Sequence, residues 1–499
     1  MKKLFNFLIK ILGALTLLFL IVFYIGYRIL FDDTMKYYPV EDPLVAEKLQ
    51  DWQDRKFGLF MHWGPYSQWG VVESWSICAE DEPWCYRGAA DNYVEYKKRY
   101  ENLQKTFNPV DFDPIKWADA AKDAGMKYLV FTTKHHDGFC MFDTNTTNYK
   151  ITDDSCAFAA DPRSDVTREI FNSFRAEDFM IGAYFSKPDW NNEYFWWPNF
   201  ATPDRNVNYN ITKYPERWEN FVDYTHTQVD ELVSNYGNID ILWFDGGWVR
   251  PLSNFESRVS DFFSSLYYQA GYTQLTPPQN QDLRMAELAD KVRKKQPGLI
   301  FVDRHIEGKE QDYMTPEQFV PDHFLPYPWE SCITMAGGWS YSFNATYKPA
   351  RQIIQMLVDV VSKGGNLLLN IGPGPDGTWD EEAYKRLEEI GDWMEVNKSA
   401  IYNTKGRELF AEDKFRFTYM DDGSINAIYL ADENETTIPS ELNIQSLKFK
   451  DIREVVFLGS SVPLQWKASG NKIKILIPDD VRNNPPCDYA WVFQLKMKD

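Results

Sequence analysis

Short apolar runs alternate with helical patterns through the middle of the chain. The strongest unit begins at the cap residue Asp113 and Pro114, places apolar residues at helical spacing and stops at Gly125, and a strand over 126–132 follows directly. Similar buried strands are predicted at 57–61, 180–185, 239–244, 299–302 and 366–371. Repeated helix–strand units favour an α/β fold, a parallel sheet closed into a (β/α) TIM-like barrel. A doubly wound open sheet is the alternative, weakened by the absence of a glycine-rich phosphate loop.

The pattern changes after about residue 405. Alternating or apolar runs there are separated by turn pairs such as Asp422-Gly423 and Gly470-Asn471, and the runs occupy 415–419, 425–430, 447–449, 473–477 and 490–493. This texture predicts a C-terminal antiparallel β-sandwich. We therefore expect a barrel domain over 35–400 and a sandwich domain over 401–499.

Residues 1–34 have a different character. Lys2, Lys3 and Lys10 precede an uncharged run over 11–27, which predicts an N-terminal transmembrane helix of near-minimal length. Because the cations lie mostly on the amino side, the rest of the chain is expected to be periplasmic or extracellular. No small-residue cleavage site follows the run, so an uncleaved membrane anchor is favoured, and cleavage would instead give a secreted protein.

Composition limits the partners. The chain has 499 residues, is 44% hydrophobic and carries a net charge of -20. It can bury a large core, and its negative charge repels phosphate backbones, so nucleic acid is not an expected partner.

Six cysteines allow disulfides in an oxidising compartment. Cys78 with Cys85, or Cys140 with Cys156, are close enough in sequence to close small loops, while free buried thiols are an equally good reading. The cysteine and histidine spacing gives no support for a structural zinc site.

Histidines gather where predicted strands end. Four of the six, His62, His135, His136 and His305, come directly after short apolar runs. In a barrel, the carboxyl ends of the strands carry the functional groups, so this pattern indicates the rim of a site. Adjacent His135 and His136 can both enter one cavity only if their strand is already ending there, as the following Asp137-Gly138 suggests.

Aromatic residues and carboxylates accompany these histidines. Asp245 follows the strand 239–244 and is itself followed by two glycines that leave space for a ligand. A pyranose offers apolar C–H faces to aromatic rings and hydroxyls to polar groups, so the mixture is typical of a sugar pocket. Cleaving a glycosidic bond needs two carboxyl groups, and Asp245 is a candidate for one of them. Taken alone, the dipeptide Asp245-Gly246 would instead indicate a turn.

Four segments resemble glycoside hydrolase family 29, the α-L-fucosidases. They are Lys-Phe-Gly-Leu-Phe-Met-His-Trp-Gly-Pro-Tyr-Ser at 56–67, Thr-Thr-Lys-His-His-Asp-Gly-Phe at 132–139, Leu-Trp-Phe-Asp at 242–245 and the block 361–373. The resemblance covers most of residues 50–400 and implies a barrel followed by a β-sandwich. It also implies an exo-acting, retaining hydrolase that removes terminal α-L-fucose from a fucosylated glycan, without a metal or organic cofactor.

The resemblance also assigns roles to residues. Asp245 resembles the nucleophile, and Glu317, in Thr315-Pro316-Glu317, best matches the general acid/base. Glu307, Glu310 and Glu330 compete with Glu317, and Glu330 lies in a Trp-Glu-Ser-Cys stretch that is also similar to the family. Seven further residues match positions that bind the sugar: His62, Glu73, His135, His136, Tyr184, Trp243 and Arg304.

Three other interpretations remain open at this point. A metal site built from His135, His136 and Asp137 is one. An α-L-galactosidase is another, because that sugar differs from fucose only by a hydroxyl at C6. The third is a catalytically inactive protein that keeps the pocket and binds fucose.

Overall fold

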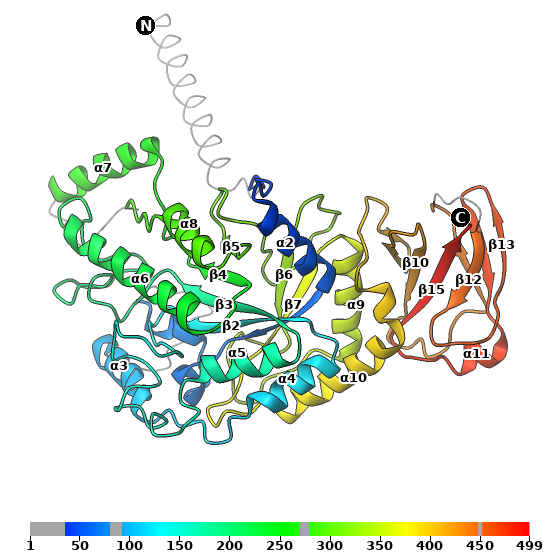
Figure 1. The fold of residues 1–499 in the computed structure, drawn as a ribbon, viewed down its shortest axis with the longest axis horizontal. Helices are drawn as coiled ribbons and strands as arrows, with labels where there is room; N and C mark the ends of the chain where they lie inside the picture. Colours follow the sequence, from blue (N-terminus) through cyan, green and yellow to red (C-terminus); the bar gives the residue numbers. More distant parts are fainter. Residues whose placement is uncertain (1–34, 80–91, 270–278, 448–451, 499) are drawn as a thin grey trace, which may run out of the picture.

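The computed structural model describes residues 35–79, 92–269, 279–447 and 452–498 (Figure 1). The predicted transmembrane helix lies outside these residues. Among the helices that are described, none is long and apolar enough to cross a bilayer.

A parallel sheet of seven strands forms the centre of the molecule, in the order β5-β4-β3-β2-β1-β7-β6. The sequence β6-β7-β1-β2-β3-β4-β5 is the cyclic order of a barrel that is open between β5 and β6, not the reversing order of a doubly wound sheet. The strands are β1 (Phe57–Met61), β2 (Tyr128–Lys134), β3 (Met180–Ser186), β4 (Ile241–Asp245), β5 (Ile300–Asp303), β6 (Glu330–Thr334) and β7 (Asn366–Ile371).

An irregular segment, residues 310–318, spans the gap between β5 and β6. On one side, the Asp303 amide donates to the Glu310 carbonyl at 2.8 Å and Asp312 donates to Phe301 at 3.0 Å. On the other side, the Cys332 amide donates to the Pro316 carbonyl at 3.1 Å. We call residues 310–318 the closing segment. The predicted parallel barrel is therefore confirmed for seven strands, and its predicted closure is interrupted at this seam, where proline removes a backbone donor from the ladder.

The predicted strands at 57–61 and 366–371 have the expected bounds, and the other four predicted barrel strands start or end within two residues of theirs. Strand β6 was not predicted. Its sequence, Glu-Ser-Cys-Ile-Thr, contains no run of large apolar residues, yet all five residues are buried. Burial inside the barrel overrides the local pattern.

Helices cover the outside of the sheet (Figure 1). In α4 (Pro114–Asp123), the Asp113 side chain accepts from the Lys116 amide at 3.1 Å, as the sequence predicted for its N-cap. The other α-helices are α2 (Pro43–Arg55), α3 (Tyr93–Glu101), α5 (Val166–Ala176), α6 (Pro215–Asn235), α7 (Asn254–Gln269), α8 (Met285–Lys295), α9 (Ala350–Ser362), α10 (Glu381–Asn397) and α11 (Asp479–Asn483). Short 3-10 helices are η1 (Pro65–Gln68), η2 (Glu73–Ile77), η3 (Asn102–Lys105) and η4 (Lys398–Ala400).

The barrel interior is packed with large side chains. Trp52 of α2 stacks on Tyr313 of the closing segment with ring centroids 4.0 Å apart, which fills the barrel at the end opposite the strands' carboxyl ends. Above this stack, Tyr128, Trp243 and Glu330 meet in the interior. The filled interior leaves the carboxyl-end rim as the place for a cavity.

The C-terminal part contains two antiparallel sheets around one core, so the predicted sandwich is confirmed. One sheet has the order β12-β15-β10-β9-β8 and the other β11-β14-β13. The strands are β8 (Ala411–Glu412), β9 (Phe415–Tyr419), β10 (Ile425–Leu430), β11 (Glu441–Ile444), β12 (Ile452–Phe457), β13 (Gln465–Ser469), β14 (Lys472–Leu476) and β15 (Ala490–Met497). The predicted strand at 447–449 lies partly outside the described residues, while β8, β11, β12 and β13 were not predicted.

Helices α9 and α10 lie between the parallel sheet and the C-terminal sheets (Figure 1). The Arg416 Nε donates to Asp359 Oδ1 at 2.6 Å, and the Trp393 indole donates to the Ala490 carbonyl at 2.9 Å. These contacts join the two parts through buried and half-buried side chains.

Cys140 and Cys156 are buried free thiols, so the bridge considered between them does not form. The other candidate pair includes Cys85, which lies outside the described residues.

Candidate active site

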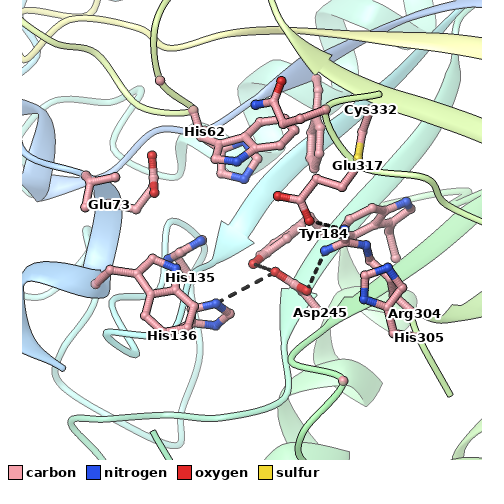
Figure 2. Close-up of a pocket in the computed structure, with 18 of the residues that line it drawn as sticks. His62, Glu73, His135, His136, Tyr184, Asp245, Arg304, His305, Glu317 and Cys332 are labelled. Atoms are coloured by element: carbon pink, nitrogen blue, oxygen red, sulfur yellow. Dashed lines mark hydrogen bonds and ion pairs between the residues drawn. The ribbon is translucent and has the colours of Figure 1, made fainter. Parts of the chain in front are cut away.

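A cavity of about 610 Å³ opens at the carboxyl ends of the parallel strands. It has a size that suits a small ligand. Every residue that the sequence predicted for the site lines it: His62, Glu73, His135, His136, Tyr184, Trp243, Asp245, Arg304 and Glu317. Figure 2 shows most of them turned toward one another across the cavity.

One guanidinium group joins the two candidate carboxylates. Arg304 donates from one terminal nitrogen to Asp245 Oδ1 at 3.0 Å and from the other to Glu317 Oε2, and its Nε donates to Thr315 Oγ1 at 3.2 Å. Only 6% of the Arg304 side chain is exposed. All three nitrogens of a buried cation are thus paired, and the two carboxylates lie on one side of the same planar group (Figure 2).

Asp245 is the last residue of β4, where the strand reaches the rim. Its Oδ2 accepts the Tyr184 hydroxyl at 2.8 Å and lies 3.7 Å from His136 Nε2. Burial by itself raises the pKa of Asp245, but the charge of Arg304, the neighbouring His136 and the Tyr184 hydroxyl outweigh burial and hold the pKa well below its ordinary value. The carboxylate is therefore ionised and oriented at neutral pH.

His62 follows β1 and His136 follows β2, and each ring is fixed by its Nδ1. His62 Nδ1 lies 2.8 Å from Asn370 Oδ1, and the Asn370 amide nitrogen donates to the Trp339 carbonyl, so His62 carries its proton on Nδ1. Since the Ser186 hydroxyl donates to Pro188, its oxygen accepts from His136 Nδ1 at 2.8 Å. Burial lowers the pKa of His62 and of His136 to about 4.

Both rings are therefore neutral at pH 7 and leave Nε2 as an acceptor. An acceptor nitrogen directed into a cavity can receive a proton from a ligand hydroxyl. His136 Nε2 and Asp245 Oδ2 are both acceptors, and a ligand hydroxyl between them would satisfy one of the two.

His135 and His136 enter the same cavity although they are adjacent in sequence. Strand β2 ends at Lys134, and the two ring centroids lie 4.2 Å apart. His135 Nδ1 contacts the Ser74 hydroxyl, and burial holds the His135 pKa well below its ordinary value. The end of the strand releases the alternation that would otherwise send the two rings to opposite faces.

Glu73 lies on the other side of the cavity from Arg304 (Figure 2). Its Oε1 accepts from the Ser340 amide at 2.7 Å, and its backbone has φ +28°, which few non-glycine residues adopt. Burial raises the pKa of Glu73 to about 7. A strained, buried acid on the wall of a cavity is typical of a ligand-binding position.

Aromatic rings form an apolar wall. Phe60 lies with its ring centroid 5.2 Å from that of Trp243 and 5.8 Å from that of Trp339. Trp243 also stacks on Tyr184 at 5.3 Å and carries the Arg304 guanidinium over its face at 5.0 Å. The cavity thus has an apolar surface directly beside its polar groups, since His62 also packs on Phe60 at 4.4 Å.

The carboxylates that competed with Glu317 lie elsewhere. Glu330 is completely buried inside the barrel and accepts from the Tyr128 hydroxyl at 2.7 Å and the Trp243 indole at 3.3 Å. Glu307 accepts the Tyr38 hydroxyl at 2.9 Å, and neither Glu307 nor Glu310 lines the cavity. Glu317 alone of the four reaches the cavity.

A metal site of His135, His136 and Asp137 is not assembled. Asp137 accepts the Tyr100 hydroxyl at 2.8 Å and faces away from the cavity. Within the described residues, the set that could hold an ion is His135, His136 and Asp245, whose ligand atoms lie within 4.8 Å of one another. Asp245 already forms an ion pair with Arg304, and the positive charge of Arg304 would repel a metal ion bound beside it.

Sequence reasoning gave no role to several residues that line the cavity: Phe60, Trp75, Arg205, Trp248, Gln318 and Trp339. Trp339 follows Gly337-Gly338 after β6, so recognising β6 would have marked it as a rim residue. Trp75 and Trp248 both lie under Arg205, at 5.0 and 5.4 Å from its guanidinium carbon. These two contacts join residues that are far apart in the sequence, so no local sequence pattern predicts them.

Comparison with known proteins identifies the family. The alpha-L-fucosidase family model matches residues 30–399, and the model of the alpha-L-fucosidase C-terminal domain matches residues 411–496. The chain belongs to the α-L-fucosidase family. The resemblance to glycoside hydrolase family 29 is therefore confirmed, and the chain is a glycoside hydrolase.

Relatives in this α-L-fucosidase family match over nearly the whole length. The alpha-L-fucosidase of Branchiostoma floridae is 28% identical, with 92% of this chain and 96% of that protein covered. Plasma alpha-L-fucosidase of Homo sapiens is 27% identical, with 92% of each covered. The solved structure of alpha-L-fucosidase isoenzyme 1 from Paenibacillus thiaminolyticus has a TM-score of 0.70 and 29% identity, covering 91% of this chain and all of that one.

The buried Glu330 makes stability depend on pH. Burial raises the pKa of Glu330 from 4.5 to about 7, so the folded protein holds a proton that the unfolded chain has lost. This contribution is present below pH 4.5 and disappears as pH rises to about 7, a loss on the order of 3 kcal/mol. Because Glu330→Gln keeps a neutral group there, we expect wild type to lose stability relative to this variant between about pH 4.5 and 7.

Urea unfolding at a series of pH values measures this difference. Glu388→Gln, at an exposed position on α10, is the control and should follow wild type at every pH. Parallel profiles for wild type and Glu330→Gln would contradict the assignment of a raised pKa.

Proposed function

We propose that this enzyme is an exo-acting, retaining α-L-fucosidase in which Asp245 is the nucleophile and Glu317 is the general acid/base. The observation that carries the proposal is the single buried Arg304 that binds both carboxylates at the rim of a family-type barrel. A guanidinium shared in this way holds the two groups within a few ångströms, consistent with the separation of roughly 5 Å in retaining glycosidases.

Asp245 is suited to attack the anomeric carbon. Its low pKa keeps it ionised, and the Tyr184 hydroxyl and Arg304 each hold one of its oxygens. Attack forms a covalent fucosyl-enzyme and breaks the bond from the anomeric carbon to the leaving oxygen. Arg304 stabilises the carboxylate when it is released again in the second step.

Glu317 is suited to the acid/base role by its position. Its side chain is 37% exposed against 17% for Asp245, so it lies nearer the mouth, where the leaving group departs. Donating a proton requires Glu317 to exchange its contact with Arg304 for one with the leaving oxygen. In the second step, Glu317 takes a proton from the water that attacks the fucosyl-enzyme.

Neutral His62 and His136 supply acceptors for the sugar hydroxyls, and Glu73 and His135 line the same polar side. The wall of Phe60, Trp243 and Trp339 supports a C6 methyl group better than a hydroxyl, because a buried hydroxyl without a partner costs free energy. This favours fucose over the L-galactose alternative. The ionised Asp245 and a second carboxylate at the mouth argue against an inactive binding protein.

Replacing the nucleophile should abolish turnover. Asp245→Ala is expected to lower kcat for 4-nitrophenyl α-L-fucoside by about 10³-fold or more, because no covalent intermediate can form. Azide should restore release of nitrophenol and give the β-fucosyl azide, since the small anion attacks from the side that Asp245 vacates. Asp223→Ala, at an exposed position on α6, is the control and should keep full activity. Absence of the β-azide would count against Asp245 as nucleophile.

Replacing the acid/base should give, with azide, the opposite anomer of fucosyl azide from the one given by Asp245→Ala. Glu317→Ala still forms the fucosyl-enzyme from α-L-fucosyl fluoride, whose leaving group needs no proton, while fucosides with poor leaving groups should slow by roughly 10²–10⁴-fold. Azide then attacks the intermediate and gives the α-fucosyl azide, identified by NMR of the product. If both classes of substrate slow equally, Glu317 is not the proton donor.

We also propose that residues 1–34 tether the enzyme to a membrane, with the barrel periplasmic or extracellular. The support is the sequence alone, an uncharged run over 11–27 behind a basic flank. The full chain should sediment with membranes after a carbonate wash, and a chain that begins at Met35 should stay in the supernatant with unchanged kcat. Recovery of the uncleaved full chain in the supernatant would contradict the tether.

A further inference from the structure

A second cavity, of about 1550 Å³, lies beside the candidate active site. It is lined by residues 35–37 and Pro39, and by residues 314–317, 319–323 and 325–328, and we call it the side groove. His305 and Glu317 line both the side groove and the active-site cavity. The proposed acid/base residue therefore forms part of the wall between them.

The side groove offers few hydrogen-bond donors. Five of its lining residues have no backbone N–H because they are prolines: Pro39, Pro316, Pro321, Pro326 and Pro328. The lining residues Asp322 and His323 pair with each other at 2.5 Å and have 94% and 71% of their side chains exposed. Lys36 is exposed as well, so the charge in the groove lies at its solvent edge and, through Glu317, at the boundary with the active-site cavity.

Apolar side chains form the rest of the surface. Tyr37 from one side stacks on Tyr327 from the other, with ring centroids 5.3 Å apart. The Tyr37 hydroxyl donates a hydrogen bond to the Asp312 carbonyl at 3.2 Å. Phe319 has 57% of its surface exposed, a large value for an aromatic residue. A saccharide needs convergent polar groups for its hydroxyls, and this surface suits an apolar ligand better.

The reaction chemistry identifies what could enter the side groove. The nucleophile attacks the face of the anomeric carbon opposite the leaving oxygen, and the general acid gives its proton to that oxygen, so the leaving group lies beside Glu317. The side groove begins at Glu317 and continues outward. A chain attached to the leaving oxygen would thus be directed along it.

We propose that the side groove is a subsite for an apolar aglycone, an alkyl or aryl group joined through oxygen to fucose. This inference rests on the proposed function and names the substrate class for it. In the first step, Asp245 forms a bond to the anomeric carbon, the bond to the aglycone oxygen breaks, and the Glu317 proton completes the alcohol. Water then releases fucose, so the products are fucose and the apolar alcohol.

The test compares n-alkyl α-L-fucosides from ethyl to octyl. Their leaving alcohols have similar acidity, so a change in kcat/KM with chain length reports binding and not chemistry. We expect kcat/KM of the full chain to rise roughly two- to fourfold for each methylene that the groove buries. α-L-Fucosyl fluoride, which has no aglycone, measures the catalytic step alone.

Phe319→Ala is the matched variant, because truncating an exposed side chain leaves the fold intact. It should lower kcat/KM for octyl α-L-fucoside by about tenfold, with no change for the fluoride, and Phe319→Leu should restore most of the loss. Phe343, with 56% of its surface exposed, lines neither cavity, so Phe343→Ala should leave both substrates unchanged.

The outcomes separate the two proposals. If the fluoride is not hydrolysed, the proposed function fails. If the fluoride is hydrolysed but kcat/KM does not depend on chain length, the aglycone subsite is overturned. It is also overturned if Phe319→Ala weakens turnover of fucosylated oligosaccharides and not of octyl fucoside, because the groove would then bind saccharide.

Discussion

The site depends on one buried cation. Arg304 has only 6% of its side chain exposed, and a desolvated guanidinium is stable only when its nitrogens are paired. Its three partners come from different parts of the chain: Asp245 ends β4, while Thr315 and Glu317 lie on the closing segment. Because Arg304 binds both carboxylates, it fixes their positions relative to each other. It also joins β4 to the closing segment between β5 and β6.

The remaining polar residues repeat the same principle on a smaller scale. Each histidine ring has its Nδ1 held by a neighbour, Asn370 for His62 and Ser186 for His136, so that Nε2 points into the cavity as an acceptor. Burial keeps these rings neutral. Burial also raises the pKa of Asp245, which stays ionised because Arg304, His136 and the Tyr184 hydroxyl outweigh that effect. Charge in the cavity is thus concentrated on the carboxylates and on Arg304 and Arg205, while the neutral histidines supply hydrogen-bond acceptors.

Sequence alone was sufficient for the parts that obey local rules. Buried strands such as 57–61 and 366–371, and the Asp113 cap, follow directly from apolar runs and capping chemistry. Strand β6 and the closing segment were out of reach, because the barrel interior buries Glu330 and Ser331, which no hydropathy pattern places in a strand. The site residues at strand ends followed from that same regular pattern, whereas Trp75, Arg205 and Trp339 meet only in the folded chain.

Asp245 lies on a regular strand and Glu317 on the irregular closing segment, and this difference affects how such an enzyme can diversify. Asp245, the proposed nucleophile, is fixed to a regular strand inside the sheet, where a change of one residue in register would disturb every neighbour. Glu317, the proposed proton donor, is carried by the closing segment, which contacts the sheet through a few backbone hydrogen bonds and contains no helix or regular strand. Insertions and substitutions beyond residue 318 can therefore change the surface that would contact the leaving group, while the surroundings of Asp245 stay constant. One scaffold can then serve many leaving groups with a single sugar.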